Sequence, residues 1–385
     1  MNLTLVDSED VAWFRDELTA ARGAAAALAR RTGLDENRCA EVALAVSEVV
    51  TNLTKHARDG ALLLRVLRTP LQAGMELVAL DHGPGIADVA EAMRDGSSTV
   101  GTLGIGLGAI RRLADTFDVY SLPGRGTVLA AGFWSRAGTG DGAVMTGRSG
   151  VAGLTRPMNG EQVCGDAWST RLDVGEARAA VASSTSSSSL QGGEMNWSAL
   201  TGTRSTPVGT ARGVAVGGGP AVLVMLCDGL GHGPMAALAG EAAVQAFRTG
   251  HARSPQDVIQ EIHRGLRGTR GAAVAVARIE PGQGRLLFCG VGNIAASLIG
   301  SDSRTVLLSS PGIVGHHMRS LRTFEHSLPR DGALVMHSDG LTERWNPTDL
   351  PGLLQHPPVV VAAQLLRHAG THRDDAGVVV ARGQW

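Results

Sequence analysis

Residues 75–86 read MELVALDHGPGI, which places an acidic residue and two glycines directly after an apolar run. The apolar run is typical of a buried strand, and glycines at a strand end let the backbone approach a ligand closely. A carboxylate in that position can accept a hydrogen bond from the amino group of adenine. The stretch therefore predicts a nucleotide-binding turn that contains Asp81, Gly83 and Gly85.

A second glycine cluster, GTLGIGLG at residues 101–108, opens a predicted helix. A helix N-terminus offers amide hydrogens and a positive dipole to a phosphate group. The dinucleotide-binding pattern G-x-G-x-x-G fits poorly, because the spacing differs and no strand immediately precedes this cluster. The two clusters favour a phosphate-binding pocket of another kind, with Gly104, Gly106 and Gly108 on one side of it.

A polar stripe runs along the helix predicted over residues 36–57. Glu41, Glu48, Asn52 and Lys55 lie seven, four and three residues apart, so they share one face of an otherwise apolar helix. Taken alone, such a stripe is explained as well by a solvated face. Beside the two glycine clusters, a face turned toward the ligand explains it better.

The length of 385 residues predicts two domains. In the first, we expect a strand at Leu3–Val6, a helix at Val11–Arg31, and strands over residues 61–67, 75–80, 118–121 and 126–133. This order predicts an α/β sandwich over residues 1–134. A glycine-rich stretch follows, and we assign residues 135–156 to a linker and 157–385 to a second domain.

Composition excludes several classes of protein. A formal net charge of -1 gives no reason to expect binding to nucleic acid or to an anionic membrane surface. The four cysteines form no Cys-x-x-Cys pair, which argues against a zinc site or a disulfide framework. No stretch approaches the roughly 20 apolar residues that span a bilayer. We therefore expect a soluble, cytoplasmic protein with no membrane segment.

Four acidic positions in the second domain lie at the ends of predicted strands: Asp166, Asp228, Asp339 and Asp374. A single Asp-Gly pair usually marks only a turn. Four such positions together predict a site for hard, oxygen-preferring cations such as Mg²⁺ or Mn²⁺, of which a pair can activate one water. His232 follows Asp228 in the same glycine-rich turn. A histidine in such a turn can either contact phosphate or serve as a capping or packing group, and the sequence favours neither role.

A segment rich in serine and glycine, about residues 181–219, interrupts the second domain between two of these aspartates. Its composition provides too little apolar surface to order a chain. We therefore predict a disordered insertion.

In the first domain, Glu48-x-x-x-Asn52, Asp81-x-Gly83-x-Gly85 and the glycines of residues 104–108 resemble the N, G1 and G2 boxes of the GHKL ATPase and kinase superfamily. Within it, residues 41–52 and 104–115 look like the anti-sigma-factor serine kinases and their stressosome switch relatives. The resemblance implies ATP, with Mg²⁺ held by Asn52, adenine read by Asp81 and Thr127, and Glu48 as the base toward a protein hydroxyl. The nucleotide-binding residues would be Asn52, Lys55, Asp81, Gly83, Gly85, Gly104, Gly106, Gly108 and Thr127.

In the second domain, residues 227–236, CDGLGHGPMA, together with Ser338-Asp339-Gly340 and Asp374-Asp375, resemble the stage II sporulation protein E branch of the protein phosphatase 2C-like enzymes. This resemblance implies an α-β-β-α sandwich and two Mg²⁺ or Mn²⁺ ions. Asp228 would bridge the ions, Asp339 would act with it in catalysis, and the other ligands would be Asp166, Asp374 and the Gly229 carbonyl. Ala376-Gly377 departs from the family pattern, which has an apolar residue and threonine there.

The two resemblances together imply a bacterial partner-switching regulator. It would combine an ATP-dependent protein serine kinase with a metal-dependent phosphoserine and phosphothreonine phosphatase. The implied partner is a STAS-domain anti-sigma-factor antagonist or a stressosome-like protein. An alternative remains, in which the first domain binds ATP only to dock a partner and regulate the phosphatase.

Overall fold

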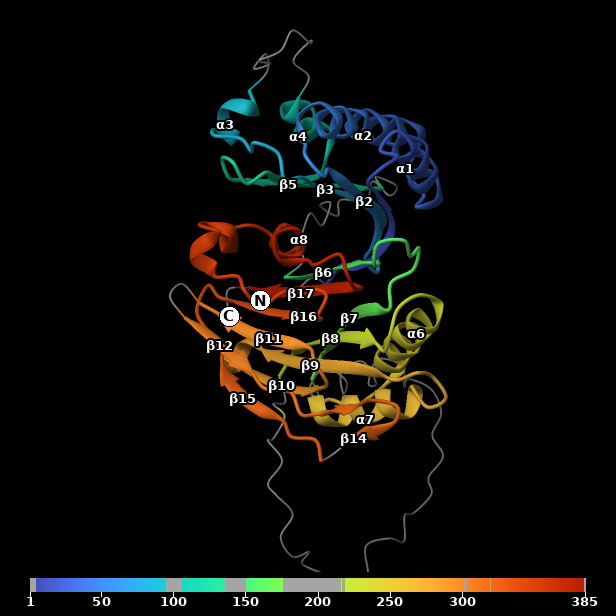
Figure 1. The fold of residues 1–385 in the computed structure, drawn as a ribbon, viewed down its shortest axis with the longest axis vertical. Coiled ribbons are helices and arrows are strands. Elements are labelled where there is room, and N and C mark those ends of the chain that lie inside the picture. Colours follow the sequence, from blue (N-terminus) through green and yellow to red (C-terminus); the bar gives the residue numbers. More distant parts are fainter. Residues whose placement is uncertain are drawn as a thin grey trace, which may run out of the picture.

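Three five-stranded sheets, a two-stranded sheet and the helices that cover the larger sheets make up the described part of the chain (Figure 1). The structure is a computed structural model, and it describes residues 5–94, 106–135, 150–175, 216, 219–300, 303–318 and 320–383. Within these ranges no helix is long and apolar enough to cross a membrane.

The N-terminal sheet is antiparallel throughout, in the order β1-β2-β3-β5-β4. Its strands are β1 (Asp7–Phe14), β2 (Ala61–Arg68), β3 (Ala73–Leu80), β4 (Thr116–Ser121) and β5 (Thr127–Trp134). One face is covered by α1 (Ala20–Arg31) and α2 (Glu36–His56), with α3 (Val89–Ala92) and α4 (Leu107–Leu113) beside them (Figure 1). Asp35 begins α2, because its side chain accepts a hydrogen bond from the Arg38 amide.

The predicted helix at Val11–Arg31 is wrong in its first part. Residues from Asp7 to Phe14 form β1, which pairs with β2 at the sheet edge, and helix α1 begins only at Ala20. Pairing in the folded chain overrides the local helical pattern here, and the indole of Trp13 donates a hydrogen bond to the Thr155 carbonyl at 2.8 Å. The strand expected at Leu3–Val6 begins in residues that lie outside the described ranges.

The C-terminal half is a sandwich of two antiparallel sheets that enclose an apolar core (Figure 1). One sheet has the order β15-β10-β9-β8-β7 and the other β12-β11-β16-β17-β6. The outer face of the first sheet carries α6 (Pro234–Thr249) and α7 (Pro255–Gly265). The strands are β6 (Val151–Arg156), β7 (Asp166–Asp173), β8 (Ala221–Gly229), β9 (Ala272–Glu280), β10 (Arg285–Val291), β11 (Ala295–Ile299), β12 (Arg304–Leu307), β15 (Phe324–Ser327), β16 (Ala333–His337) and β17 (Ala376–Arg382), and a separate pair is formed by β13 (Gly312–Ile313) and β14 (His317–Met318).

Strand β6 corrects the linker expected at residues 135–156. Its six residues pair with β17, and Val151, Ala152 and Leu154 are buried. The last part of the expected linker therefore belongs to the second domain, because a short apolar run beside the glycines completes a sheet edge. Residues 136–149, and nearly all of the insertion expected at 181–219, lie outside the described ranges.

Helix α8 (Pro358–Ala369) lies between the two halves of the molecule (Figure 1). It covers the outer face of the β17 sheet, and its opposite side packs on the face of the N-terminal sheet that α1 and α2 leave uncovered. Residues from both halves, such as Leu63, Val128, Val361, Leu365 and Val378, form one apolar cluster. The two domains therefore share a core around this helix.

Buried polar contacts also join the halves. The Arg65 guanidinium on β2 is almost fully buried, and it pairs with Asp10 at 2.6 Å and Glu76 at 2.9 Å. It also donates a hydrogen bond to the Gly153 carbonyl on β6 at 2.7 Å. Burial raises the pKa of Glu76, while the neighbouring Arg65 guanidinium opposes that rise.

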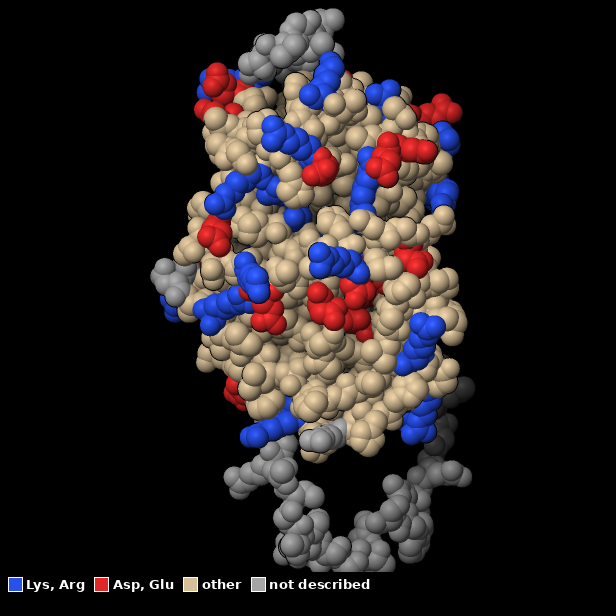
Figure 2. All heavy atoms as spheres, viewed as in Figure 1, with Lys and Arg blue, Asp and Glu red and all other residues tan. Residues whose placement is uncertain are grey.

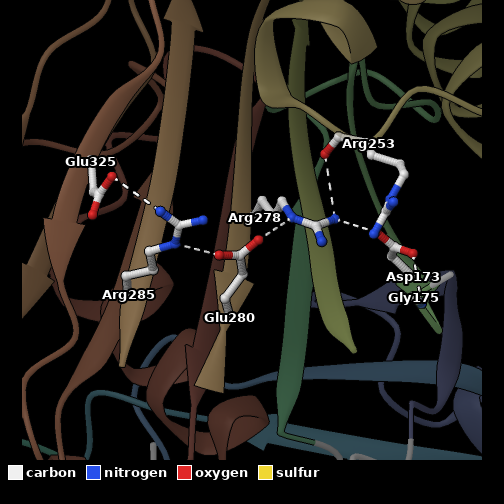
Figure 3. Close-up of polar contacts among 7 residues, drawn as sticks. All are labelled: Asp173, Gly175, Arg253, Arg278, Glu280, Arg285 and Glu325. Carbon is white, nitrogen blue, oxygen red and sulfur yellow. Dashed lines mark hydrogen bonds and ion pairs between the residues drawn. The ribbon is translucent and has the colours of Figure 1, made fainter. Parts of the chain in front are cut away.

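A chain of ion pairs crosses the β7–β15 sheet (Figure 3). Arg278 on β9 is fully buried and pairs with Asp173 at 2.6 Å and with Glu280 at 2.7 Å. Glu280 in turn pairs with Arg285 at 2.5 Å. The chain links the end of β7 to β9 across β8, near the start of the expected insertion.

Candidate active sites

Two carboxylates face each other at the edge where β7 begins and β8 ends. Asp166 and Asp228 are direct partners in the antiparallel register. Like charges placed directly opposite each other destabilise a sheet. Burial and the neighbouring Asp228 raise the pKa of Asp166 well above its usual value, and burial with the nearby Asp339 raises the pKa of Asp228 to about 7. A bound cation would relieve this repulsion.

Ser338 fixes Asp166 in place. Its hydroxyl donates a hydrogen bond to Asp166 Oδ2 at 2.6 Å and accepts one from the Gly377 amide at 2.9 Å. All of Ser338 is buried. A Cβ atom at Gly377 would lie only 3.1 Å from Asp166 Oδ2, so glycine here lets the carboxylate approach β17.

The adjacent aspartates 374 and 375 have different surroundings. Asp375 is buried, and its two oxygens accept hydrogen bonds from the amides of Met158 and Gly165, both at 2.7 Å. Asp374 is only partly buried, and one of its oxygens accepts the Asp375 amide at 2.9 Å. Asp375 thus holds the loop before β7, while Asp374 is the better placed of the two to be a ligand.

Asp339 is exposed at the end of β16, where Asn293 Nδ2 donates a hydrogen bond to its Oδ2 at 2.6 Å. Partial burial and the nearby Asp374 raise the pKa of Asp339. The backbone at Gly229 belongs to the same region, because its amide donates to the Gly165 carbonyl at 3.2 Å. A Cβ atom at Gly165 would lie 3.5 Å from the Gly229 carbonyl oxygen and 3.0 Å from Asp375 Oδ2. The expected ligands therefore gather at one end of the sandwich.

The donor set fits a hard cation in its chemistry. Every expected ligand is a carboxylate or a carbonyl oxygen, and the pKa values of Asp228 and Asp339 are raised by burial and partly by neighbouring carboxylates, as close negative charges do. Among the described residues, no three His, Cys, Asp or Glu side chains already stand in the geometry of a formed metal site. Acidic side chains also gather near the middle of the face shown in Figure 2.

His232 pairs with Glu161, its Nδ1 lying 2.9 Å from Oε1. Glu161 also lies close to Gly233 at the start of α6, where a Cβ atom would be 3.2 Å from its Oε2. About half of the His232 side chain is exposed. The contact gives His232 a defined partner in the turn after Asp228 without deciding between phosphate contact and packing.

In the N-terminal half, Asp81 ends β3 as expected. Its amide donates to the Thr127 carbonyl at 3.0 Å, and its Oδ1 accepts the Gly83 amide at 2.6 Å. Burial raises the pKa of the Asp81 carboxyl, and the Gly83 amide opposes that rise. Gly85 has φ +70°, and a Cβ atom there would overlap the Leu122 carbonyl, so the turn requires glycine.

Thr127 lies beside this turn on β5. Its hydroxyl is 2.9 Å from Ser121 Oγ, which accepts the Ile86 amide at 2.8 Å. The threonine is thus tied to the residue that follows Gly85. This arrangement brings Asp81, Gly83, Gly85 and Thr127 together, as the sequence predicts.

The polar stripe of α2 divides into two parts. Glu41 pairs with the buried Arg38, which also contacts Asp115 and donates to the Leu113 carbonyl at 2.6 Å. This end of the stripe ties α2 to α4 and β4. Glu48 and Asn52 are partly buried further along the helix, and Lys55 is exposed.

The far end of α2 adjoins the glycine turn. The His82 amide donates to the Arg58 carbonyl at 2.8 Å, and a Cβ atom at Gly83 would lie 2.7 Å from the His56 carbonyl oxygen. Gly106 begins α4 and Gly108 is buried in its first turn, whereas Gly104 lies outside the described ranges. The roles expected for these residues stay predictions.

The sequence analysis gave no role to three residues that make defined contacts in or beside these sites. Ser338 stands directly before Asp339, a position that could have drawn attention to it. Arg38 and Arg367 carry no such signal, because several of their contacts reach residues that are distant in the sequence: Arg38 pairs with Asp115, and the Asp81 carbonyl accepts a hydrogen bond from Arg367 Nη1 at 3.0 Å.

The fold and the two sites define a class of protein: a nucleotide-binding α/β domain joined to a phosphatase-type β-sandwich with a carboxylate centre. Residues 15–132 match the histidine kinase-like ATPase domain, and residues 218–384 match stage II sporulation protein E (SpoIIE). The chain therefore carries a histidine kinase-like ATPase domain in its first half and a SpoIIE-like domain in its second.

Two curated relatives resemble the first half. Serine/threonine-protein kinase RsbT of Bacillus subtilis is 34% identical over 120 residues, which cover 31% of this chain and 90% of RsbT. The anti-sigma F factor of Caldanaerobacter subterraneus subsp. tengcongensis is 31% identical over 113 residues, covering 28% of this chain and 79% of that factor. The chain therefore joins an RsbT-like kinase domain to a SpoIIE-type phosphatase domain.

Solved structures resemble the chain more loosely. RsbX in complex with magnesium is 16% identical with a TM-score of 0.43, and the match covers 60% of this chain and 92% of RsbX. The phosphatase domain of SpoIIE from Bacillus subtilis with a fragment of its regulatory domain is 14% identical with a TM-score of 0.41, covering 80% of this chain and 79% of that one. At these scores the solved structures add nothing to the assignment.

Proposed function

We propose that the chain is a bifunctional, cytoplasmic partner-switching regulator. Its N-terminal domain would phosphorylate a serine of a STAS-domain protein with ATP, and its C-terminal domain would hydrolyse phosphoserine or phosphothreonine on a partner of that class. The observation that carries the phosphatase half is the facing pair Asp166 and Asp228, whose pKa values are raised within a cluster of carboxylates. The substrate class rests on the similarity to RsbT and to the anti-sigma F factor.

At the phosphatase centre, Asp228 would bridge two Mg²⁺ or Mn²⁺ ions, and Asp166, Asp339, Asp374 and the Gly229 carbonyl would complete their ligands. When bound, the ions would lower the pKa of a water molecule and neutralise charge on the phosphoryl group. Ser338 keeps Asp166 aimed at the centre through its 2.6 Å hydrogen bond, and Asn293 does the same for Asp339.

In the kinase half, Asp81 and Thr127 would bind adenine, and Asn52 would hold the Mg²⁺ on the phosphates. Glu48 stands one helical turn before Asn52. From there its carboxylate can orient or deprotonate an incoming serine hydroxyl. The glycine turns let the backbone come close to the nucleotide.

The decisive experiment for the phosphatase is Mn²⁺-dependent release of phosphate from a phosphorylated STAS protein. Asp228→Asn should abolish release and weaken Mn²⁺ binding together, because the bridging carboxylate loses its charge. Asp331→Asn is the matched control, since Asp331 is exposed and has φ +55°, a conformation that asparagine also adopts. Full activity of Asp228→Asn would refute the two-metal assignment.

The second candidate function is a docking role for the first domain. The shared core around α8 favours it, because this core places the nucleotide turn against the phosphatase half. Transfer of label from radioactive ATP to a STAS protein separates the two functions. Binding of ATP without any transfer by the wild type would favour docking.

A further inference from the structure

Arg367 belongs to the phosphatase half, yet its side chain ends at the nucleotide turn of the other half. Its Nη1 donates hydrogen bonds to the carbonyl oxygens of Asp81, at 3.0 Å, and of Arg125. Its Nε and Nη2 donate to Gln364 Oε1 at 3.1 and 3.0 Å, which fixes the plane of the guanidinium. The residue is 7% exposed, so these contacts stand in a dry environment.

The contacts surround the residue expected to read adenine. Asp81 lies between the Arg367 guanidinium on its carbonyl side and Gly83 on its carboxylate side. Gly126, which precedes Thr127, has φ +80°, and a Cβ atom there would be 2.9 Å from Arg367 Nη1. The backbone of Arg367 takes part as well, because its carbonyl lies 3.3 Å from His82 Nε2.

The end of the same helix lies against the carboxylate centre. The carbonyl of Ala369, the last residue of α8, accepts the Thr342 amide at 2.9 Å. The Thr371 amide donates to the Gly340 carbonyl at 2.9 Å, and Leu341 forms a bridge with Gly370. These contacts tie the end of α8 to the loop that begins at Asp339, and the chain then continues to Asp374.

We propose that Arg367 is a positioning residue of the nucleotide site and that α8 couples nucleotide binding to the phosphatase centre. This inference rests on the nucleotide-binding role proposed for Asp81. A nucleotide that binds to Asp81 would displace the Asp81 carbonyl, which accepts a hydrogen bond from Arg367. Because the interior is close-packed, such a displacement is transmitted along the helix rather than absorbed locally. Coupling of this kind is reciprocal, and typically changes affinity by about 5- to 150-fold.

The test uses the full chain and the variants Arg367→Met, Arg367→Lys and Arg248→Met. Arg248 is the matched control, because it also makes a contact between the halves, with Asp7 at 2.7 Å, but is about half exposed and belongs to neither site. Calorimetry measures the dissociation constants of Mg²⁺-ATP and Mg²⁺-GTP. Amide hydrogen exchange at residues 340–342 and 369–371, with and without Mg²⁺-ATP, measures the coupling.

In the wild type, ATP should bind in preference to GTP and should protect both segments from exchange. Arg367→Met should weaken ATP binding roughly tenfold, since the carbonyls of Asp81 and Arg125 lose a charged donor, and should lower the preference for ATP and remove the protection. Arg367→Lys should recover part of each effect, because it keeps a charged donor. Arg248→Met should behave as the wild type does.

A purely structural role for Arg367 would lower the unfolding temperature and leave the ratio of ATP to GTP affinity unchanged, which would overturn the proposal. Wild-type protection in Arg367→Met would overturn it too. If Arg367→Met does not fold, Arg367→Lys and Gln364→Leu decide, with the same two readouts. A wild type that binds no ATP would instead refute the nucleotide site itself, and its phosphatase activity would still stand as a separate result.

Discussion

Ser338→Ala removes the hydroxyl that orients Asp166. The hydroxyl makes two buried hydrogen bonds, one to Asp166 Oδ2 at 2.6 Å and one from the Gly377 amide at 2.9 Å. Leaving each partner unsatisfied costs about 1–3 kcal/mol, so we expect the loss of both to lower the free energy of unfolding by about 2–6 kcal/mol. The Ser338 hydrogen bond also lowers the pKa of Asp166, and its loss should raise that pKa further.

The consequence for the phosphatase is weaker metal binding. When Asp166 holds its proton more tightly, that proton competes with Mn²⁺ for the carboxylate. The Mn²⁺ concentration that gives half-maximal phosphate release should therefore increase about tenfold at pH 7. The increase should shrink at higher pH, where Asp166 loses its proton. Denaturant unfolding and Mn²⁺ titrations of phosphate release at pH 7 and pH 8.5 measure the two effects.

Ser297→Ala is the control for this prediction. Ser297 is another buried serine, on β11, and its hydroxyl accepts a hydrogen bond from Arg304 Nε at 3.2 Å, away from the carboxylates. It should lower stability without changing the Mn²⁺ dependence. If Ser338→Ala shows the wild-type Mn²⁺ dependence at both pH values, Ser338 does not orient a metal ligand and the reasoning fails.

Four further predictions concern the two sites and the ion pairs of the β7–β15 sheet. Asp81→Asn should weaken ATP binding roughly ten- to a hundredfold, and unchanged binding by calorimetry would contradict its role. Glu48→Gln should keep ATP binding while phosphotransfer to a STAS protein falls by roughly 10²–10⁴, a result that normal transfer would exclude. Arg278→Met should lower the free energy of unfolding by about 3–5 kcal/mol in denaturant titrations, because Asp173 and Glu280 lose a fully buried cationic partner; a loss below 1 kcal/mol would show that their other partners, Arg253 and Arg285, are sufficient. In the metal-free folded protein the pKa of Asp228 is raised to about 7, so this group stabilises the fold below its unfolded pKa and loses that contribution as the pH rises through 7. The metal-free protein should therefore melt at a lower temperature at pH 8 than at pH 5. Adding Mn²⁺ should restore the melting temperature at pH 8 but not change it at pH 5.

The sequence predicted the elements that local patterns determine. The turn at Asp81, Gly83 and Gly85 follows its strand as expected, because glycine is required there by backbone conformation alone. The two-domain α/β fold and the α-β-β-α sandwich are confirmed. Elements whose formation depends on distant partners were missed, namely β1, which needs β2, and β6, which needs β17.

Strand β2 carries a sequence signal that indicates burial on both faces but does not identify the elements that cover it. Its residues ALLLRVLR do not alternate between apolar and polar, which is typical of a strand buried on both faces. Leu62 and Leu64 pack under α1 and α2, while Leu63 packs in the cluster around α8. The pattern indicates a second covering layer, but no local rule says that the layer comes from a helix almost 300 residues further on.

The core around α8 also determines how the protein unfolds. Because Val361 and Leu365 are buried in a cluster that includes both the β3–β5 strands and β17, neither half can unfold without exposing apolar surface of the other. The chain should therefore melt as one cooperative unit, although its families usually describe separate domains. Dividing the chain within residues 136–149 would expose one side of α8 and one side of the N-terminal sheet to water. Each half would then be aggregation-prone and partly unfolded rather than an independent domain.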